Sequence, residues 1–459
     1  MSPSTPTARR LFARGSTLLG GSGAALGASF LQTILIARGL GPESFGVWAG
    51  IQAFCTVVAT LVTFRTSEPV TRYLVEYRTR NQTALPTTPS DLPSSACGDP
   101  RRVELLLGTA ITVDAVTQIL AIIAIILSAP WVAPILSGGE GAVVFYPLVG
   151  IGLLRSVFDH TWFSVARDLG RYRTIATLNA LFPALRLAVT AALWLADALT
   201  LATLAMLMMV TGIVQMLITG RYLQRAINSG YGIGITALFP SDLLQRQHQL
   251  SSFWSFMKAT FLWSLFTALV KEGDILILGG LRPAEEVGWY RLAKNLISIA
   301  QQVADLLSQV IYQDFSEQVV ACDGVALRRT IRFLAKTWLP VIVVMTLVSI
   351  GLAHWVIPFI FGSVYQPTAE IFSILLIGSG VVTMLFWVRP LALALELHWY
   401  NFQVVAWGTI LFLGLDWVLI HAWGVLGAAT AFSLLTVAGP IALLPPVWRK
   451  LNRMHTELP

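Results

Sequence analysis

The sequence predicts an all-α integral membrane protein with about twelve transmembrane helices, and three observations support this fold class. The chain has 459 residues, a mean hydropathy of +0.70 and 12% charged residues, whereas soluble domains carry about 25% charged residues. Segments of about 20 apolar residues, the length that a membrane span needs, recur along the chain. The connections between them are too short to form a separate soluble domain.

Twelve such segments follow one another, with approximate ends. They cover residues 16–37, 46–67, 103–127, 143–164, 174–196, 199–220, 259–281, 289–311, 337–360, 369–389, 401–420 and 424–447.

The positive charges follow this predicted topology. Of the 31 Lys and Arg, 22 lie in the two tails and in alternate loops, and only Arg38, Arg282 and Arg291 lie on the opposite side. Because Lys and Arg are enriched in cytoplasmic loops, we expect a multi-pass protein of the cell (inner) membrane with both termini in the cytoplasm. The net charge of +7 is explained by topology, so no nucleic-acid partner is predicted.

The two halves of the chain resemble each other at matching outer loops. The stretch Leu40–Trp48 resembles Leu281–Tyr290, and Trp131–Leu136 resembles Trp355–Ile360. Two matches in the same order predict a duplicated six-helix unit. Since each unit has an even number of spans, the two copies are parallel, and duplicated transporters place their cargo between the two lobes.

We therefore predict three regions. Residues 1–222 form an N-terminal six-helix lobe, 223–258 a cytoplasmic amphipathic linker, and 259–459 a C-terminal six-helix lobe. The two lobes are expected to surround a central cavity.

Basic side chains within or beside the spans indicate what this cavity binds. They are Arg65, Arg155, Arg186, Lys271, Lys294 and Arg389. A cation near the bilayer centre costs about 2.5–3.5 kcal/mol, so several are tolerated only if they face a hydrated cavity or pair with acids. A cationic cavity indicates an anionic cargo. The predicted substrate-binding residues are Arg186, Lys271, Arg291, Lys294 and Arg155.

Arg186 is the best of these candidates, because no acid lies within one helical turn of it and a guanidinium binds phosphate or carboxylate oxygens in a bidentate manner. Arg155 and Asp159 are four residues apart and can pair along a helix, either as a structural pair or as a gate near the inner mouth. Arg65 and Arg389 lie towards cytoplasmic span ends, where their side chains are expected to reach the interface.

A polar stripe in the eighth span has two interpretations. Its residues recur at steps of three and four, which places them on one helical face. They are Arg291, Lys294, Asn295, Ser298, Gln302, Asp305 and Gln309. The stripe forms either the wall of a hydrated cavity, which we favour, or a polar seam between packed helices.

Acidic residues in the spans are candidates for ion pairs or for binding a coupling ion. They are Asp274, Asp114, Asp159 and Asp305. Asp274 shares a face with Lys271, as an internal ion pair or as the partner of a phosphate-binding lysine. Asp114 and Asp416 are lone acids that bind a proton or Na⁺, or hydrogen-bond a neighbour. No cofactor and no metal site are predicted, and coupling to Na⁺ or H⁺ stays open.

No catalytic motif is present, so we do not expect an enzyme. The chain has no nucleophile elbow, no metal-spaced His/Cys cluster and no phosphate-binding Walker A loop.

With these features, the chain resembles the Wzx-type polysaccharide transporters, in the superfamily of the MATE drug exporters and the MurJ lipid II flippase. The residues that carry the resemblance are Ala37–Gly46, Asp274, Gly288, Tyr290, Ala293, Phe361, Gly362, Tyr365, Ala369, Gly424, Gly427, Ala428 and Ala429. The resemblance implies two lobes that turn a polyprenyl-pyrophosphate oligosaccharide from the cytoplasmic to the outer leaflet by alternating access. Its partners would be this lipid-linked oligosaccharide, the lipid bilayer and the polysaccharide biosynthesis machinery.

Other functions remain open. A MATE-type multidrug or cation antiporter would require Asp274 and Asp114 instead of the bases. A membrane-embedded polysaccharide polymerase or ligase generally has a large outer loop, whereas the outer loops here are short and nearly uncharged. A non-transporting scaffold of the same fold is a further alternative. About twelve spans, against fourteen helices in MurJ, argue against lipid II as the cargo.

Overall fold

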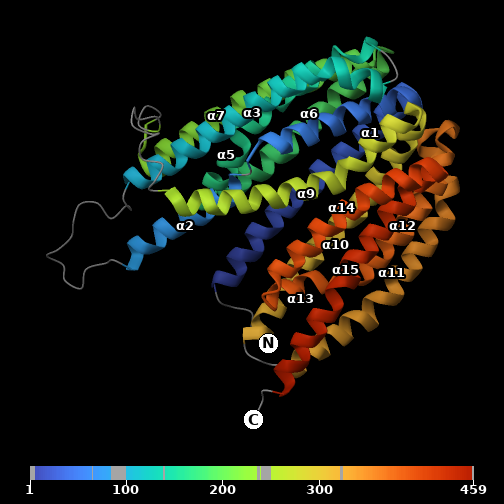
Figure 1. Cartoon of the computed structure of the whole chain (residues 1–459). Helices are drawn as coiled ribbons and strands as arrows, with labels where there is room; N and C mark the ends of the chain where they lie inside the picture. Colours follow the sequence, from blue (N-terminus) through green and yellow to red (C-terminus); the bar gives the residue numbers. More distant parts are fainter. Residues whose placement is uncertain are drawn as a thin grey trace. The chain divides into compact units, whose positions relative to one another are not determined.

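The computed structural model describes residues 6–64, 66–83, 100–137, 140–234, 238, 250–320 and 324–456. These residues form helices and short connections, without a β-strand among them (Figure 1). The α-helices are α1 (Pro6–Val62), α2 (Ser67–Thr83), α3 (Pro100–Ser137), α4 (Phe145–Gly152), α5 (Ser156–Asp168), α6 (Tyr172–Leu195), α7 (Leu201–Tyr231), α9 (Ser251–Leu281), α10 (Ala284–Val320), α11 (Gly324–Phe361), α12 (Pro367–Met384), α13 (Val388–Ala394), α14 (His398–Trp423) and α15 (Val425–Thr456).

Each predicted span lies on one of these helices or on a pair of helices separated by a short turn. Within the described residues, eight helical segments are long and apolar enough to cross a membrane, and one of them, Gly20–Val62, carries the first two predicted spans. The other predicted spans fall on the short helices α4 and α5 and on α9 and α10. The last two carry charged residues in mid-helix.

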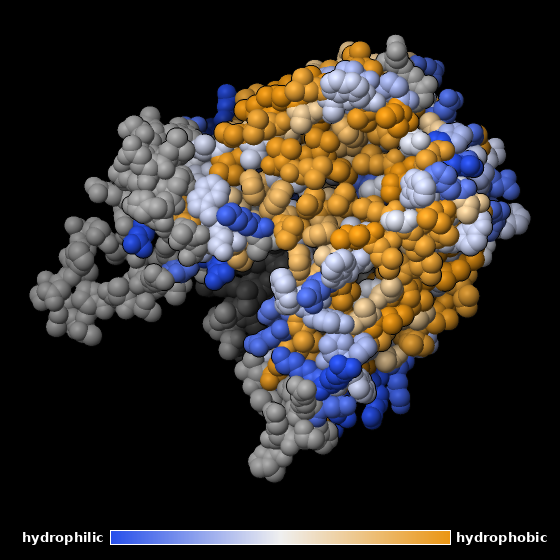
Figure 2. Space-filling view, viewed as in Figure 1, coloured by the Kyte–Doolittle hydropathy of each residue, from blue (hydrophilic) through white to orange (hydrophobic). Residues whose placement is uncertain are grey.

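Large apolar side chains cover the outside of the helices. On α11, Trp355 is 80% exposed and Phe359 is 81% exposed, and α3 and α14 expose Leu127 and Leu411 in the same way. Figure 2 shows hydrophobic side chains, in orange, over much of the helices on the face in view. Monomeric soluble proteins rarely expose apolar patches larger than a few hundred Å². The chain is therefore a multi-pass membrane protein whose apolar faces contact lipid.

The first two predicted spans are joined by a sharp break. Gly41 has φ 73° and ψ 170°, a conformation outside the helical region, and it divides α1 into two arms. A residue with a side chain rarely adopts this positive φ, whereas glycine does so without a steric penalty. Pro42 follows and has no backbone N–H to donate to the preceding turn. The Gly-Pro sequence therefore makes the connection that was expected between the two spans.

Residue contacts divide the chain into two units. Unit 1 comprises Met1–Gly39, Cys55–Ala133 and Glu140–Leu265, and unit 2 comprises Leu40–Phe54, Pro134–Gly139 and Phe266–Pro459. The boundaries predicted at residues 222 and 258 stay a prediction, because much of the intervening segment lies outside the described residues.

Each unit has its own core. In unit 1, α2, α3, α5, α6, α7 and the start of α9 bury residues such as Leu106, Val165 and Leu223. Phe253 and Met257, at the C-terminal end of the predicted amphipathic linker, are also buried in this core. In unit 2, one cluster lies around Tyr290 and a second lies around Leu391.

Two glycines of the internal repeat pack against each other within unit 2. A Cβ atom at Gly46 would overlap the carbonyl oxygen of Ala284, and a Cβ atom at Gly288 would overlap the carbonyl oxygen of Pro42. Gly46 and Gly288 occupy matching positions of the two resembling loops, as do Pro42 and Ala284. The contact is therefore reciprocal, as a two-fold relation requires, and it supports the predicted duplication.

This contact predicts a specific loss of stability. Gly46→Ala and Gly288→Ala should each lower the melting temperature of the detergent-solubilised protein, because the new methyl group meets backbone atoms and overpacking typically costs about 1–3 kcal/mol. Gly414→Ala in α14, where a Cβ would have open space, is the matched control and should leave the melting temperature unchanged or raise it. Equal melting temperatures for all three variants would contradict the close packing.

Candidate functional site

Unit 1 contains a cavity of about 800 Å³ that is lined by charged and polar side chains. Two of the predicted substrate-binding residues, Arg155 and Arg186, line this cavity, and Asp159 does so too. These residues come from the α4–α5 junction, from α6 and from α5. The structure thus brings together charged residues that the sequence places in separate spans.

A break in the fourth predicted span positions Arg155. Leu153–Arg155 form one turn of 3₁₀-helix between α4 and α5, and such a turn within a helical run often marks a functional position. Beside it, a Cβ at Gly152 would press on the Met208 carbonyl, and a Cβ at Gly212 would overlap the Gly152 carbonyl. The glycines allow α4 and α7 to approach closely, which carries Gln215 of α7 to the cavity.

Arg186 is the cation of this cavity that is least compensated. Its side chain is half-buried, and its Nε atom is buried without a hydrogen-bond partner among the described residues. Arg155 lies close enough to interact with it electrostatically as a like charge. Two guanidinium groups that face one cavity repel each other until an anion lies between them, so the geometry suits a phosphate or carboxylate ligand.

The charges around the cavity have a positive balance. The described residues that line it include four arginines and two carboxylates: Arg72, Arg155, Arg167, Arg186, Glu68 and Asp159. Arg72, Arg167 and Glu68 were not expected here from the sequence, because they lie outside the predicted spans. In the sequence, only their position close to the ends of predicted spans could have indicated that they line the cavity. The cavity is therefore cationic overall.

The two candidate acids of unit 1, Asp159 and Asp114, accept hydrogen bonds from neutral donors. Asp159 accepts a hydrogen bond from Gln215 Nε2 at 3.0 Å. The buried Asp114 accepts hydrogen bonds from Thr66 Oγ1 at 2.7 and 2.9 Å and from Thr161 Oγ1 at 3.0 Å. Of the alternatives open for Asp114, the structure shows hydrogen bonds to neighbours. The Arg155–Asp159 pair predicted along one helix does not form an ion pair in the described structure, although the two charges interact at longer range.

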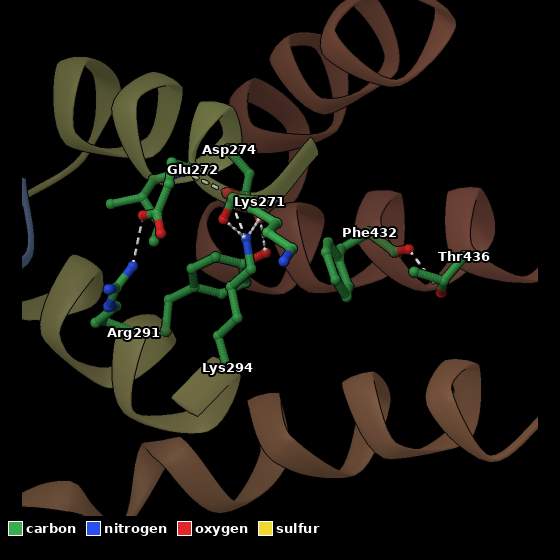
Figure 3. A network of polar contacts seen from close by, with 9 residues as sticks. Lys271, Glu272, Asp274, Arg291, Lys294, Phe432 and Thr436 are labelled. Atoms are coloured by element: carbon green, nitrogen blue, oxygen red, sulfur yellow. Dashed lines mark hydrogen bonds and ion pairs between the residues drawn. The ribbon is translucent and has the colours of Figure 1, made fainter. Parts of the chain in front are cut away.

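Unit 2 contains a dense polar network between α9 and α10 (Figure 3). Lys294 Nζ donates to Asp274 Oδ1 at 2.7 Å, to Asp274 Oδ2 at 2.6 Å and to the Lys271 carbonyl at 2.6 Å. Tyr290 Oη donates to Asp274 Oδ2 at 2.5 Å, and the Ile275 amide donates to Asp274 Oδ1 at 2.8 Å. Asp274 is completely buried and has a donor on both oxygens.

A second ion pair lies beside this network. Arg291 Nη1 donates to Glu272 Oε2 at 2.6 Å, with both side chains less than one-fifth exposed. Figure 3 shows Arg291 and Lys294, on the same helix, each reaching to an acid of α9. Arg291 and Lys294 are therefore both paired with acids in this structure, and their predicted role in binding a cargo stays a prediction.

Lys271 differs from these two cations. Its side chain is exposed, and no described residue forms an ion pair with it. The predicted pairing of Lys271 with Asp274 is replaced by the Lys294–Asp274 pair, because the acid points to the neighbouring helix instead of along its own. Of the cations predicted in unit 2, Lys271 is the one that keeps an unpaired charge.

Three residues of the sequence-based prediction cannot be placed, and one of them is Gln309 of the polar stripe, whose side chain lies outside the described side chains. Arg65 lies outside the described residues, and the side chain of Asp305 lies outside the described side chains.

The first residues of the polar stripe of α10 form a seam between packed helices. Arg291 and Lys294 form a seam with α9. Further along the helix, Gln301 and Ser308 line a second cavity, of about 740 Å³, together with Arg389 of α13. These two residues each precede a stripe residue by one position, so the cavity-wall interpretation of the stripe itself stays a prediction. Apolar side chains form most of the remaining wall of that cavity.

Comparisons with known proteins agree with this architecture. A family model described as polysaccharide biosynthesis protein matches residues 12–317. No curated protein gives a significant match. Among solved structures, the chain is similar to a lipid II flippase MurJ in an inward closed conformation, with a TM-score of 0.68 and 12% identity over 97% of this chain and 90% of that chain.

Two transporters of the MOP superfamily are also similar. An inward-facing multidrug resistance MATE family transporter gives a TM-score of 0.65 at 11% identity, over 95% of this chain and 96% of that chain. A transporter from Pyrococcus furiosus, described as having a binding pocket of reverse polarity, gives a TM-score of 0.58 at 12% identity over 99% of both chains. At these identities the similarity shows the fold alone, which is the two-lobed helical fold predicted from the sequence.

The Lys294–Asp274 pair predicts an asymmetric response to mutation. Lys294→Gln should lower the free energy of unfolding by about 3–5 kcal/mol, because the buried carboxylate of Asp274 loses its counter-charge. The double variant Asp274→Asn/Lys294→Gln removes both charges and should lose less than the single variant. Thermal unfolding in detergent measures both effects, and a double-mutant cycle without coupling would contradict the pairing.

Proposed function

Because the chain belongs to the polysaccharide biosynthesis protein family, we propose that it is a flippase for a lipid-linked oligosaccharide. It moves a polyprenyl pyrophosphate oligosaccharide from the cytoplasmic to the outer leaflet by alternating access, for the synthesis of cell-surface polysaccharide. The fold shared with a lipid II flippase supports a function of this kind.

The cationic cavity of unit 1 is the observation that carries this proposal. A pyrophosphate has several anionic oxygens, and guanidinium groups bind such oxygens in a bidentate manner. Arg186 and Arg155 supply two guanidinium groups in one cavity, and Arg186 lacks a partner for a buried nitrogen. Gln215 and Asn179 add neutral hydrogen-bonding groups to the same wall, which suits a sugar next to the phosphate.

The same polarity separates this function from antiport of cationic drugs. A cation would have to enter a cavity that four arginines line against two carboxylates. The similarity to MATE transporters lies in the fold, and the charge of this cavity favours an anionic cargo. A Na⁺ or H⁺ gradient and the membrane potential are candidate energy sources. Moving one charge through the membrane potential is worth about 2.3 kcal/mol per 100 mV. With the inside negative, outward movement of an anion is favourable.

The leaflet distribution of the lipid-linked oligosaccharide tests the proposal. Depletion of the protein should leave this lipid in the cytoplasmic leaflet, and re-expression should restore it to the outer leaflet. An unchanged distribution together with normal surface polysaccharide would contradict the function and would favour drug or ion antiport.

Variants of Arg186 connect the function to the cavity in the same assay. Arg186→Ala should reduce transport roughly tenfold to hundredfold, since a hydrogen bond to a charged group is worth about 1.5–3 kcal/mol. Arg186→Lys should retain part of the activity, because it keeps the charge but loses the bidentate geometry. Arg282→Ala is the control, because Arg282 pairs with Glu286 in unit 2 and does not line the cavity. Equal transport by the Arg186→Ala and control variants would exclude Arg186 from cargo binding.

The proposed location is the cell (inner) membrane with both termini in the cytoplasm. The distribution of Lys and Arg supports this orientation. A reporter that is active only in the cytoplasm should be active when fused to the C-terminus and inactive when inserted near Arg282. The opposite pattern would require an inverted topology.

A further inference from the structure

Asp416 on α14 is a buried acid that the network of unit 2 does not satisfy. Its exposed fraction is 0%. Neither of its carboxylate oxygens has a hydrogen-bond partner among the described residues. Asp274 and Asp114 are equally buried, but each accepts hydrogen bonds from neighbouring groups.

The titratable groups that act on Asp416 come from the two helices of the network. Asp274 of α9 and Lys294 of α10 interact with it electrostatically, and so does Tyr290 of α10. The facing part of α15, residues 425–447, contains no charged residue, and it contributes Phe432, whose ring centroid lies 4.7 Å from Lys294 Nζ.

The remaining charged or titratable groups lie towards the two ends of α14. His421 lies in its last turn, and Arg282 lies against Gly424, directly after the helix. Arg389 of α13 and Lys450 of α15 belong to the region where α14 begins, and Lys450 donates to the Leu395 carbonyl there. By the helix rise of 1.5 Å per residue, that end is roughly 27 Å away from Asp416.

Lys294 does not neutralise Asp416 in this structure. An ammonium has three protons to donate, and Lys294 directs its hydrogen bonds to the two oxygens of Asp274 and to the Lys271 carbonyl. Lys294 and Asp274 together carry no net charge. An ionised Asp416 would therefore add one uncompensated negative charge, without a donor from the described residues, in a membrane-embedded core. Burial of such a charge is very unfavourable, and the group binds a proton instead.

We propose that Asp416 is a proton-binding site and that its carboxyl is protonated in the conformation seen here. A metal ion fits this site less well than a proton. The described residues contain no group of three or more His, Cys, Asp or Glu side chains that could hold a metal. The oxygens of Asp274 are already occupied by Lys294, Tyr290 and the Ile275 amide.

The network also indicates how the proton leaves. If Lys294 turns away, Asp274 keeps two donors of its own, Tyr290 Oη and the Ile275 amide, which offset part of the lost ion pair. Asp416 has no such donors and needs either its proton or the ammonium of Lys294. A movement that brings Lys294 or water to Asp416 breaks the carboxyl O–H bond, and the proton passes to water. The proton site does not depend on the cargo; its use to drive export rests on the proposed function.

Infrared difference spectroscopy of the purified full-length protein tests the site. A protonated carboxyl has a C=O stretch well separated from that of a carboxylate, and this band shifts in D₂O. We expect such a band at neutral pH, its loss in Asp416→Asn, and its retention in Asp197→Asn, which changes an exposed acid. Retention of the full band in Asp416→Asn would overturn the proposal, as would a band that responds to Na⁺ at constant pH.

A second variant covers a loss of folding in Asp416→Asn. Asp416→Glu keeps a carboxyl at this position and should shift the frequency of the band without abolishing it, while a band unchanged from the wild type would overturn the assignment. The two proposals can fail separately. If the infrared band behaves as expected but depletion of the protein leaves the lipid distribution unchanged, the proposed cargo is wrong and the proton site still holds.

Discussion

The structure depends on one constraint, which is that charged side chains within the membrane must be compensated. The charged side chains between α9 and α10 follow this rule. Lys294 and Asp274 pair across α9 and α10, and Arg291 pairs with Glu272 beside them. Because an unpaired charge in lipid is so costly, the exceptions are informative. Arg186, in the cavity of unit 1, has a buried nitrogen without a hydrogen-bond partner among the described residues. An anionic cargo would accept a hydrogen bond from such a nitrogen.

Close helix packing places these groups, and glycines make it possible. In unit 1, Gly152 and Gly212 bring the backbones of α4 and α7 into contact, which sets Gln215 beside Asp159. In unit 2, Gly46 and Gly288 pack reciprocally. Small residues allow such approach in membrane helices, where lipid offers little hydrophobic drive for association. The glycine contacts therefore contribute to function indirectly, by fixing the helices that carry the charges.

The two units handle positive charge in different ways. Unit 1 concentrates arginines around a cavity with few acids, whereas in unit 2 Arg291 and Lys294 pair with acids on the neighbouring helix. This division fits a transporter in which one cluster recognises an anion and the other responds to a proton. A shared fold does not determine which charges line a cavity, so this charge distribution is a property of the chain itself.

The sequence by itself determined the membrane class, the approximate spans, the internal duplication and the family resemblance. These properties depend on composition and on the spacing of residues along the chain. A run of about 20 apolar residues forms a helix in lipid, because only then does the segment satisfy its own backbone hydrogen bonds. The partners of the charged residues were decided by the tertiary structure alone. Lys271 is three residues from Asp274 in sequence, yet Lys294 from the next helix pairs with that acid. Arg155 and Arg186 belong to different spans but face one cavity. Such pairings depend on how helices rotate and approach each other, and spacing within one helix does not contain that information.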